Sequence, residues 1–283
     1  MMKLGFKSKL VSLVLLFFLV QVVSVGIVYV VSLLMGSQHS MEEMMMMPQA
    51  AAYSLFLTNV LMCLSFFLLP WYNKGNFRLQ GLRVGDFLFT IVLMIPVIFV
   101  VNMLLEFFNP VDLYKETIRK LAYDPFGVLA ITFLAPMAEE LVFRVGCMKI
   151  MLDNKVAPWT AILVSSLIFG LVHANPVQIG GAMMIGVLLG WLYWRSKSFW
   201  LPFVAHVVNN SFAIIVLWCN GGEDMTIKGM SGVEEYDWLF FLINILIAGA
   251  LVFYLHRRFT VIESEREKGN DVICSEVHRN GDS

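Results

Sequence analysis

Apolar residues are gathered along the chain into long runs, and short polar segments separate these runs. A run of about 20 apolar residues is what an α-helix needs to cross the hydrocarbon core of a membrane. By that measure the sequence predicts eight spanning helices, at about residues 10–35, 51–69, 84–108, 126–150, 157–173, 177–195, 199–219 and 237–256. We therefore predict an all-α protein, a polytopic membrane bundle of about eight transmembrane helices.

The fifth and sixth runs are short, and only Ala174, Asn175 and Pro176 lie between them. Proline lacks a backbone donor and disfavours helical backbone at the residue before it. The pattern therefore favours a tight helical hairpin over one long helix.

The same pattern divides the chain into four parts. Residues 1–125 hold three helices and a segment, 109–124, whose apolar residues could line one face of a short interfacial helix. Residues 126–219 form a core of four helices, and residues 220–259 hold an acidic loop and the last spanning helix. Residues 260–283 are charged and poor in apolar residues, which predicts a mobile cytoplasmic tail.

The composition agrees with a membrane protein. Hydrophobic residues make up 59% of the chain and charged residues 14%, whereas soluble domains contain ~45–50% and ~25%. The lipid bilayer is therefore the expected surrounding. The net charge of −1 creates no field that would attract nucleic acid, so we expect no nucleic-acid partner.

The placement of lysine and arginine predicts the orientation, because cytoplasmic loops of membrane proteins are rich in both. We expect an integral protein of the bacterial inner (plasma) membrane with the N- and C-termini in the cytoplasm. The exception is the segment 109–124, whose Lys115, Arg119 and Lys120 fall on the opposite side. With alternating helices, the basic residues that fall on the cytoplasmic side are Lys3, Lys7, Lys9, Lys74, Arg78, Arg83, Lys155, Arg195, Lys197, Arg257 and Arg258.

Charged side chains within a spanning helix cost roughly 2.5–3.5 kcal/mol each on insertion scales, so they mark a functional site by default. The fourth run contains Glu139, Glu140 and Arg144. Glu140 and Arg144 are four residues apart on one helix face, where they can form an ion pair. Glu139 is turned ~100° away and has no partner in its own helix, so it is the candidate general base. The alternative is a buried ion-pair network that only fixes helix packing.

Further polar residues lie in the next runs. His173 ends the fifth run, with Phe169 one turn before it, and His206 and Asn210 are one turn apart in the seventh. A lone histidine on an apolar helix is more often a packing residue than a catalytic one. Two histidines, a carboxylate and an amide on neighbouring helices instead favour a hydrolytic site. Other asparagines in apolar runs are candidates for interhelical hydrogen bonds: Asn59, Asn102, Asn209 and Asn244.

Two chemical routes fit these residues. In one, Glu139 and His173 activate a water directly, while His206 and Asn210 donate hydrogen bonds to the developing oxyanion, and no cofactor is required. In the other, Glu139, His173 and His206 ligate zinc, and the metal activates the water. The chain contains no H-E-x-x-H motif, so the residues leave both routes open.

Three motifs resemble those of a known family. They are Glu139-Glu140-x-x-x-Arg144, Phe169-x-x-x-His173 and His206-x-x-x-Asn210. In this order and spacing they resemble the CAAX protease and bacteriocin-processing (CPBP, or Abi) family, which includes the Ras-converting CAAX endopeptidase. The resemblance covers about residues 126–215.

The resemblance implies an all-helical intramembrane endopeptidase. By position, Glu139 and His173 would activate the water, His206 and Asn210 would hold the oxyanion, and the other motif residues would support the site. The resemblance favours the metal-free route, with zinc as the alternative. It does not imply a prenylated substrate.

We therefore expect hydrolysis of a peptide bond in a membrane-associated protein or peptide. Two other classes of function compete with this interpretation. Buried Glu, His and Arg also form the proton relays of proton-coupled transporters, although the chain shows no inverted repeat of the kind many transporters have. A catalytically silent scaffold, such as a bacteriocin-immunity protein, is the second alternative.

Overall fold

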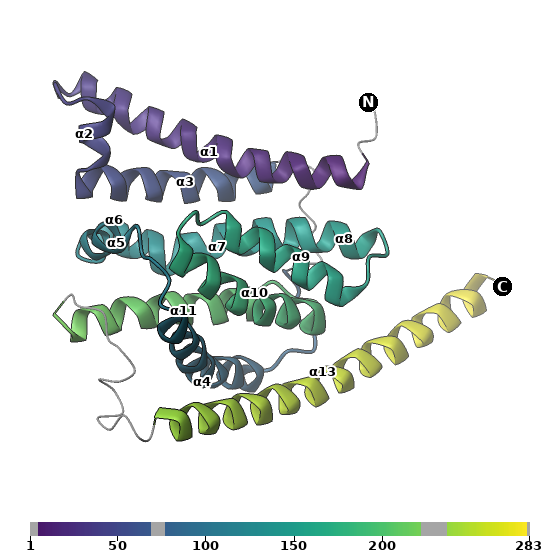
Figure 1. The fold of residues 1–283 in the computed structure, drawn as a ribbon. Coiled ribbons are helices and arrows are strands. Elements are labelled where there is room, and N and C mark those ends of the chain that lie inside the picture. Colours follow the sequence, from purple (N-terminus) through teal and green to yellow (C-terminus); the bar gives the residue numbers. More distant parts are fainter. Residues whose placement is uncertain (1–4, 69–76, 222–236, 282–283) are drawn as a thin grey trace.

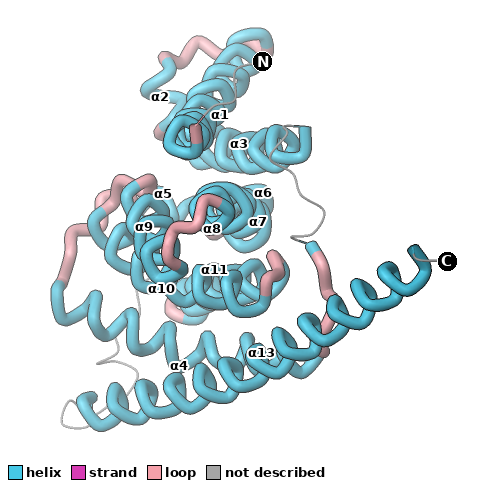
Figure 2. The backbone as a smooth tube through the Cα atoms, turned by 90° about the vertical axis from the view of Figure 1, so that its right-hand side faces the viewer, coloured by secondary structure: helices cyan, strands magenta, loops and turns pink. Residues whose placement is uncertain are grey.

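A computed structural model describes residues 5–68, 77–221 and 237–281, with side chains up to residue 264. Within these ranges the chain forms helices and no strand (Figures 1 and 2). The predicted all-α membrane bundle is confirmed. Lys74 and most of the predicted acidic loop lie outside the described residues.

Seven of the eight predicted runs form helices long and apolar enough to cross a membrane. They are α1 (Phe6–Leu34), α3 (Pro48–Leu68), α4 (Val84–Phe108), a composite span over Pro125–Asp153, α10 (Pro176–Ser196), α11 (Trp200–Cys219) and α13 (Asp237–Gly281). The eighth is α9 (Pro158–Leu171), whose 14 residues make a helix only about 21 Å long. It is therefore shorter than the hydrocarbon core.

The composite span is not a regular α-helix. It runs through α6 (Pro125–Leu129), the π-helical segment η2 (Ala130–Leu134), α7 (Ala135–Glu140), the π-helical segment η3 (Leu141–Met148) and α8 (Lys149–Asp153). π-Helical turns are rare and are frequent at functional sites. Glu139 and Glu140 end α7, between the two irregular segments.

The helices form layers around the composite span (Figures 1 and 2). α1 and α3 pack antiparallel on one side of the span, joined through the short α2 (Met41–Met45). The hairpin of α9 and α10 and helix α11 occupy the centre, and α4 with α13 covers the far side. The buried core follows the central helices, and most outward side chains are apolar, as a lipid-facing surface requires.

The short α9 is joined to α10 by the predicted tight turn. Ala174 adopts a left-handed backbone (φ 52°), and Pro176 begins α10. The fully buried Asn175 fixes this turn, because its Nδ2 donates to Asp112 Oδ1 (2.8 Å) and its Oδ1 accepts from the Leu113 backbone (3.0 Å). The segment that follows α4 is thereby tied over the hairpin.

Two expectations need revision. The segment 109–124 contains a short helix, α5 (Lys115–Leu121), but Val111 and Leu113 precede it and are exposed, so only part of the predicted apolar face belongs to the helix. Residues 260–281, which belong to the predicted tail, continue α13 as helix. Extending an existing helix is much easier than nucleating one, and this segment contains several good helix formers. Its mobility stays a prediction.

The α9–α10 packing gives the first testable prediction. A Cβ added at Gly170 would lie 2.8 Å from the Ile179 carbonyl oxygen and would meet the Met183 side chain. Gly170→Ala is therefore expected to destabilise the protein by about 1–3 kcal/mol, seen as a lower Tm in detergent. Gly249 has open space around the same position, so Gly249→Ala is the control and should leave Tm unchanged or slightly raised. Equal effects of the two substitutions would contradict this close approach.

Candidate active site

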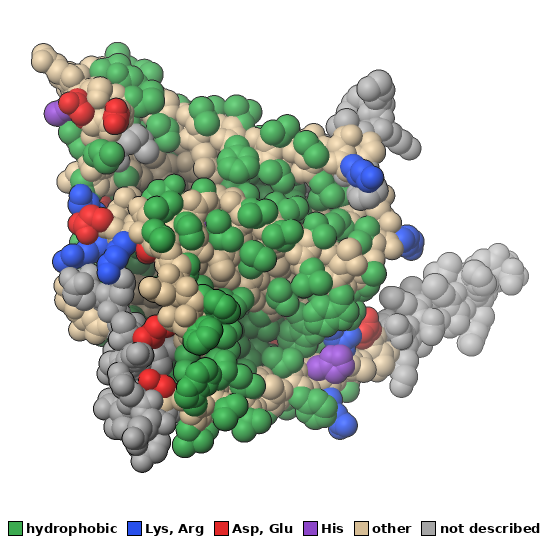
Figure 3. All heavy atoms as spheres, viewed as in Figure 1, with side chains coloured by type: hydrophobic (Ala, Val, Ile, Leu, Met, Phe, Trp, Pro, Cys, Tyr) green, Lys and Arg blue, Asp and Glu red, His purple; other side chains and the backbone are tan. Residues whose placement is uncertain are grey.

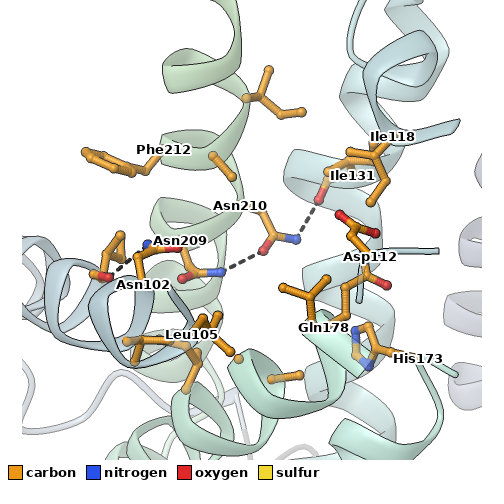
Figure 4. A pocket seen from close by; sticks show the side chains of 18 of the residues that line it. Asn102, Leu105, Asp112, Ile118, Ile131, His173, Gln178, Asn209, Asn210 and Phe212 are labelled. Carbon is orange, nitrogen blue, oxygen red and sulfur yellow. Dashed lines mark hydrogen bonds between the residues drawn. The ribbon is translucent and has the colours of Figure 1, made fainter. Parts of the chain in front are cut away.

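A cavity of about 1010 Å³ lies among α4, α7, α10 and α11. All four predicted catalytic residues, Glu139, His173, His206 and Asn210, line it, together with Phe169. Figure 4 shows how Asn210 and His173 reach toward the same space from different elements. Residues that are up to 71 positions apart in the sequence therefore share one cavity.

Beneath the cavity lies the predicted ion pair. Arg144 Nε is 3.1 Å from Glu140 Oε2, and both side chains are fully buried. Arg144 Nη1 also donates to Ser165 Oγ (3.0 Å), which in turn donates to the Phe143 carbonyl oxygen (3.0 Å). A buried charge is stable only when it is paired and hydrogen-bonded. Ser165 thus anchors the pair to α9.

His206 lies between the two glutamates. Its Nδ1 is 3.1 Å from Glu140 Oε1, and its Nε2 is 3.5 Å from Glu139 Oε2. Because Glu140 is an acceptor held by Arg144, Nδ1 is the donating nitrogen toward it, and the Nε2 edge meets Glu139. Glu139, for which we expected no partner in its own helix, thus meets a side chain that α11 supplies.

His173 has a fixed orientation as well. Its Nδ1 is 2.7 Å from the Phe169 carbonyl oxygen. A carbonyl only accepts, so Nδ1 carries the hydrogen, and Nε2 of the neutral ring is left with a lone pair. This is the tautomer that a base acting on water through Nε2 requires.

Phe169 connects these groups through its ring. The ring packs edge-on against His173 and His206, with centroid distances of 5.1 and 5.6 Å, and the Arg144 guanidinium lies 5.1 Å from its centroid. The Phe169 backbone holds His173, while the ring contacts both imidazoles and the Arg144 guanidinium. The supporting position that we predicted for Phe169 thus has a physical basis.

Asn210 is oriented by an irregular stretch of backbone. In η2 the Ala135 N–H bonds to the Ala130 carbonyl, and the next residue, Pro136, has no N–H. The Ile131 carbonyl is thereby left without its helical donors, and it accepts from Asn210 Nδ2 (2.9 Å). Asn210 Oδ1 accepts from Asn209 Nδ2 (3.1 Å). This chain, visible in Figure 4, fixes the amide orientation and leaves one Nδ2 hydrogen available.

The zinc alternative was tested against the donor set. Within residues 5–68, 77–221 and 237–264, no group of three His, Cys, Asp or Glu side chains converges to hold a metal ion. Glu139, His173 and His206 do not form such a group as the structure places them.

Sequence reasoning missed several residues of the site. Ser165 lies in an ordinary apolar run, and Asn209 was considered only as a candidate for interhelical hydrogen bonding. Asp112 and Asn175 are 63 positions apart, so no local spacing connects them. The signals that could have drawn attention were Pro136 inside a spanning run and the adjacent pair of asparagines.

The fold and the cavity define an integral membrane protein of many helices with a buried carboxylate–imidazole–amide site. Residues 122–212 match the model of the type II CAAX prenyl endopeptidase Rce1-like family. The matched segment contains all three motifs, so the resemblance drawn from them is confirmed over these residues.

Two curated proteins are similar to parts of the chain. "Putative membrane peptidase YdiL" of Bacillus subtilis (strain 168) is 34% identical over 95 residues, which cover 32% of this chain and 37% of that protein. "CAAX prenyl protease 2" of Arabidopsis thaliana is 26% identical over 128 residues, which cover 38% of this chain and 41% of that protein. The chain thus spans less than half the length of either relative. No solved structure matches it.

The buried ion pair gives the second prediction. Glu140→Gln leaves the Arg144 charge buried without its carboxylate, so we expect a loss of about 3–5 kcal/mol in stability. Adding Arg144→Met removes both charges and should recover much of that loss. Thermal unfolding of the purified protein in detergent measures both effects.

The control for this cycle is an exposed pair in the same span. Lys149 and Asp153 also lie four residues apart (2.6 Å), and Asp153 is 60% exposed. Asp153→Asn should therefore cost no more than about 1 kcal/mol. The stability lost in the double variant is compared with the sum of the losses in Glu140→Gln and Arg144→Met alone. If the two are equal, the two buried charges do not depend on each other.

Proposed function

We propose that this protein is a membrane-embedded endopeptidase that hydrolyses a peptide bond of a membrane-associated protein or peptide. The observation that carries the proposal is the meeting of Glu139 and His206 on the wall of a cavity that His173 and Asn210 also line. The match of residues 122–212 to a prenyl endopeptidase family supports the same class of reaction.

Glu139 acts as the general base in the proposed reaction. Its carboxylate takes a proton from a water in the cavity while the water oxygen attacks the carbonyl carbon of the substrate. His173 assists through Nε2, the nitrogen that its bond to Phe169 leaves free. The carbon–nitrogen bond then breaks, and the leaving amine takes the proton from Glu139.

His206 and Asn210 stabilise the oxyanion in this proposal, Asn210 through its remaining Nδ2 hydrogen and His206 through Nε2, which carries a hydrogen when both ring nitrogens are protonated. Both lie on α11, one turn apart, and both are held in place by other groups: His206 by Glu140, and Asn210 by the Ile131 carbonyl and Asn209. Donors that are oriented before the reaction need no reorganisation as charge develops on the oxygen, which is the main requirement for such stabilisation.

We propose that the reaction needs no metal, since the side chains described above do not converge as a ligand set. We also place the protein in a bacterial plasma membrane with both termini in the cytoplasm, on the distribution of its basic residues. The lipid bilayer surrounds it, and the substrate reaches the cavity from the membrane or its surface.

The third prediction tests the base. Glu139→Gln keeps the shape of the side chain but removes its basicity, so hydrolysis should fall by about 10²-fold or more while Tm changes little. Substrates are found by mass spectrometry of peptide termini in cells that express the wild-type protein or the variant. Glu116, exposed on α5, supplies the control, and Glu116→Gln should cleave normally.

The outcomes separate the competing functions. Termini that depend on Glu139 and persist when the purified protein is treated with a chelator support the metal-free endopeptidase. Loss of cleavage on chelation, restored by zinc, overturns the metal-free part alone. If no terminus depends on Glu139, the endopeptidase proposal falls, and Glu139-dependent proton flux in vesicles would then indicate a transporter.

The fourth prediction concerns the backbone behind Asn210. Pro136→Ala supplies an N–H that can bond to the Ile131 carbonyl and compete with Asn210. We expect kcat to fall by about 10- to 100-fold, because a displaced catalytic group costs this much, with a smaller change in KM. Pro158→Ala is the control, since this proline stands in the first turn of α9, where a backbone N–H has no helical partner. Equal kcat values for the two variants would contradict the role of the Ile131 carbonyl.

A further inference from the structure

The cavity belongs to one half of the bundle. On α4, α10 and α11 its lining residues fall within 98–106, 177–185 and 206–217, the halves of these helices that lie toward α5 and the α9–α10 turn (Figure 1). Residues 109–112 form its rim, and Val111 there is 64% exposed. The cavity therefore opens to the outside at this end of the bundle, which we call the mouth end.

The opposite end is closed. Fully buried apolar side chains, among them Leu141, Phe143 and Phe199, fill the interior below Glu139. Ion pairs then tie α13 across this end, because Arg258 reaches Asp86 on α4 (3.2 Å) and Arg195 on α10 reaches Glu263 (3.3 Å). A substrate has no described passage to Glu139 from this side.

The two ends differ in charge, as Figure 3 shows at the two sides of the molecule. Among the described residues, the mouth end carries only Lys115, Arg119 and Lys120 as basic residues, accompanied by several acidic ones. The closed end carries Lys7, Lys9, Arg78, Arg83, Lys149, Lys155, Arg195, Lys197, Arg257 and Arg258. Orientation in membranes follows lysine and arginine, and acidic residues contribute little, so the closed end is the cytoplasmic one.

We propose that the cavity opens on the extracytoplasmic side, and that the protein acts on polypeptide presented from that side. This rests on the proposed endopeptidase function for the nature of the substrate. The substrate class is then an exported peptide, or the extracytoplasmic flank of a membrane-anchored protein. A peptide whose scissile bond stays in the cytoplasm cannot reach Glu139.

The lining of the cavity suits an extended, mostly apolar peptide. Asn102, Gln178 and Asn209 present side-chain amides, which can both donate to and accept from a peptide backbone. Between them lie apolar side chains such as Leu105 and Ile185. Backbone hydrogen bonds combined with apolar pockets are how extended peptides are commonly held.

Cysteine labelling tests the direction of the opening without any need for activity. In a background of Cys219→Ser and Cys274→Ser, one variant carries Val111→Cys at the rim and a matched variant carries Asn154→Cys in the α8–α9 turn at the closed end. A charged, membrane-impermeant maleimide is added to intact cells and to permeabilised cells. We expect Val111→Cys to react equally in both, and Asn154→Cys to react only after permeabilisation.

The opposite pattern overturns the proposal. So does a Val111→Cys that reacts in neither preparation, because the rim would then not be open to water. The native Cys219, exposed at the C-terminal end of α11, serves as a second reporter in the otherwise unaltered chain. It is expected to react in intact cells.

The substrate class is tested by where the Glu139-dependent cuts fall. We expect these sites in exported peptides or on the extracytoplasmic side of the substrates' own spans, and sites on the cytoplasmic side would overturn the proposal. Failure of this proposal and failure of the endopeptidase function are distinguishable. If Val111→Cys is labelled from outside but no cut depends on Glu139, the extracytoplasmic opening stands and the endopeptidase function falls. If Val111→Cys is labelled only from the cytoplasm and Glu139-dependent cuts occur, the endopeptidase function stands and the extracytoplasmic opening falls.

Discussion

The interior of this protein depends on one buried ion pair. Glu140 and Arg144 lie fully buried, where a single unpaired charge would cost several kcal/mol. Each therefore requires its partner, and two further contacts hold the pair: Ser165 from α9 accepts from Arg144, and His206 from α11 meets Glu140. These contacts join the composite span to α9 and α11. The position of His206, and through it the environment of Glu139, follows from this requirement.

A second constraint comes from backbone irregularity. A regular helix uses all of its inner carbonyls, so it has none to offer to a neighbouring side chain. Here the π-helical turn at Ala130–Leu134 and the missing N–H of Pro136 leave the Ile131 carbonyl to Asn210. The short α9 likewise ends within the bundle, and its last turn offers the Phe169 carbonyl to His173. The amide of Asn210 and the imidazole of His173 are therefore both oriented by the main chain, which is stiffer than any side chain.

The sequence predicted what local spacing determines. Apolar runs gave the spans, and the four-residue spacing gave the pairing of Glu140 with Arg144. The sequence did not predict that His206 would lie between two glutamates, because that contact joins positions 66 residues apart and depends on helix packing. The contact of Ser165 with Arg144 was not predicted for a related reason, since the hydroxyl of a serine in an apolar run usually forms a hydrogen bond within its own helix. The π-helical segments were missed because apolar composition reports burial and not helix winding.

The proposed hydrolysis inside a membrane poses a conflict that the layout of this bundle would resolve. Water must reach the reacting carbonyl, yet buried charges are stable only where water and lipid are excluded or their partners are fixed. The access of water and the protection of the buried charges are assigned to different halves of the bundle. One half is packed around Arg144, where burial strengthens every charge interaction, and the other half is hollowed and lined with amides. Glu139 and His206 lie at the boundary between the two halves. Each is held on the side of the packed half, and each faces the cavity in the hollowed half. A general base needs this position, because it must be fixed in place and still exchange protons with water.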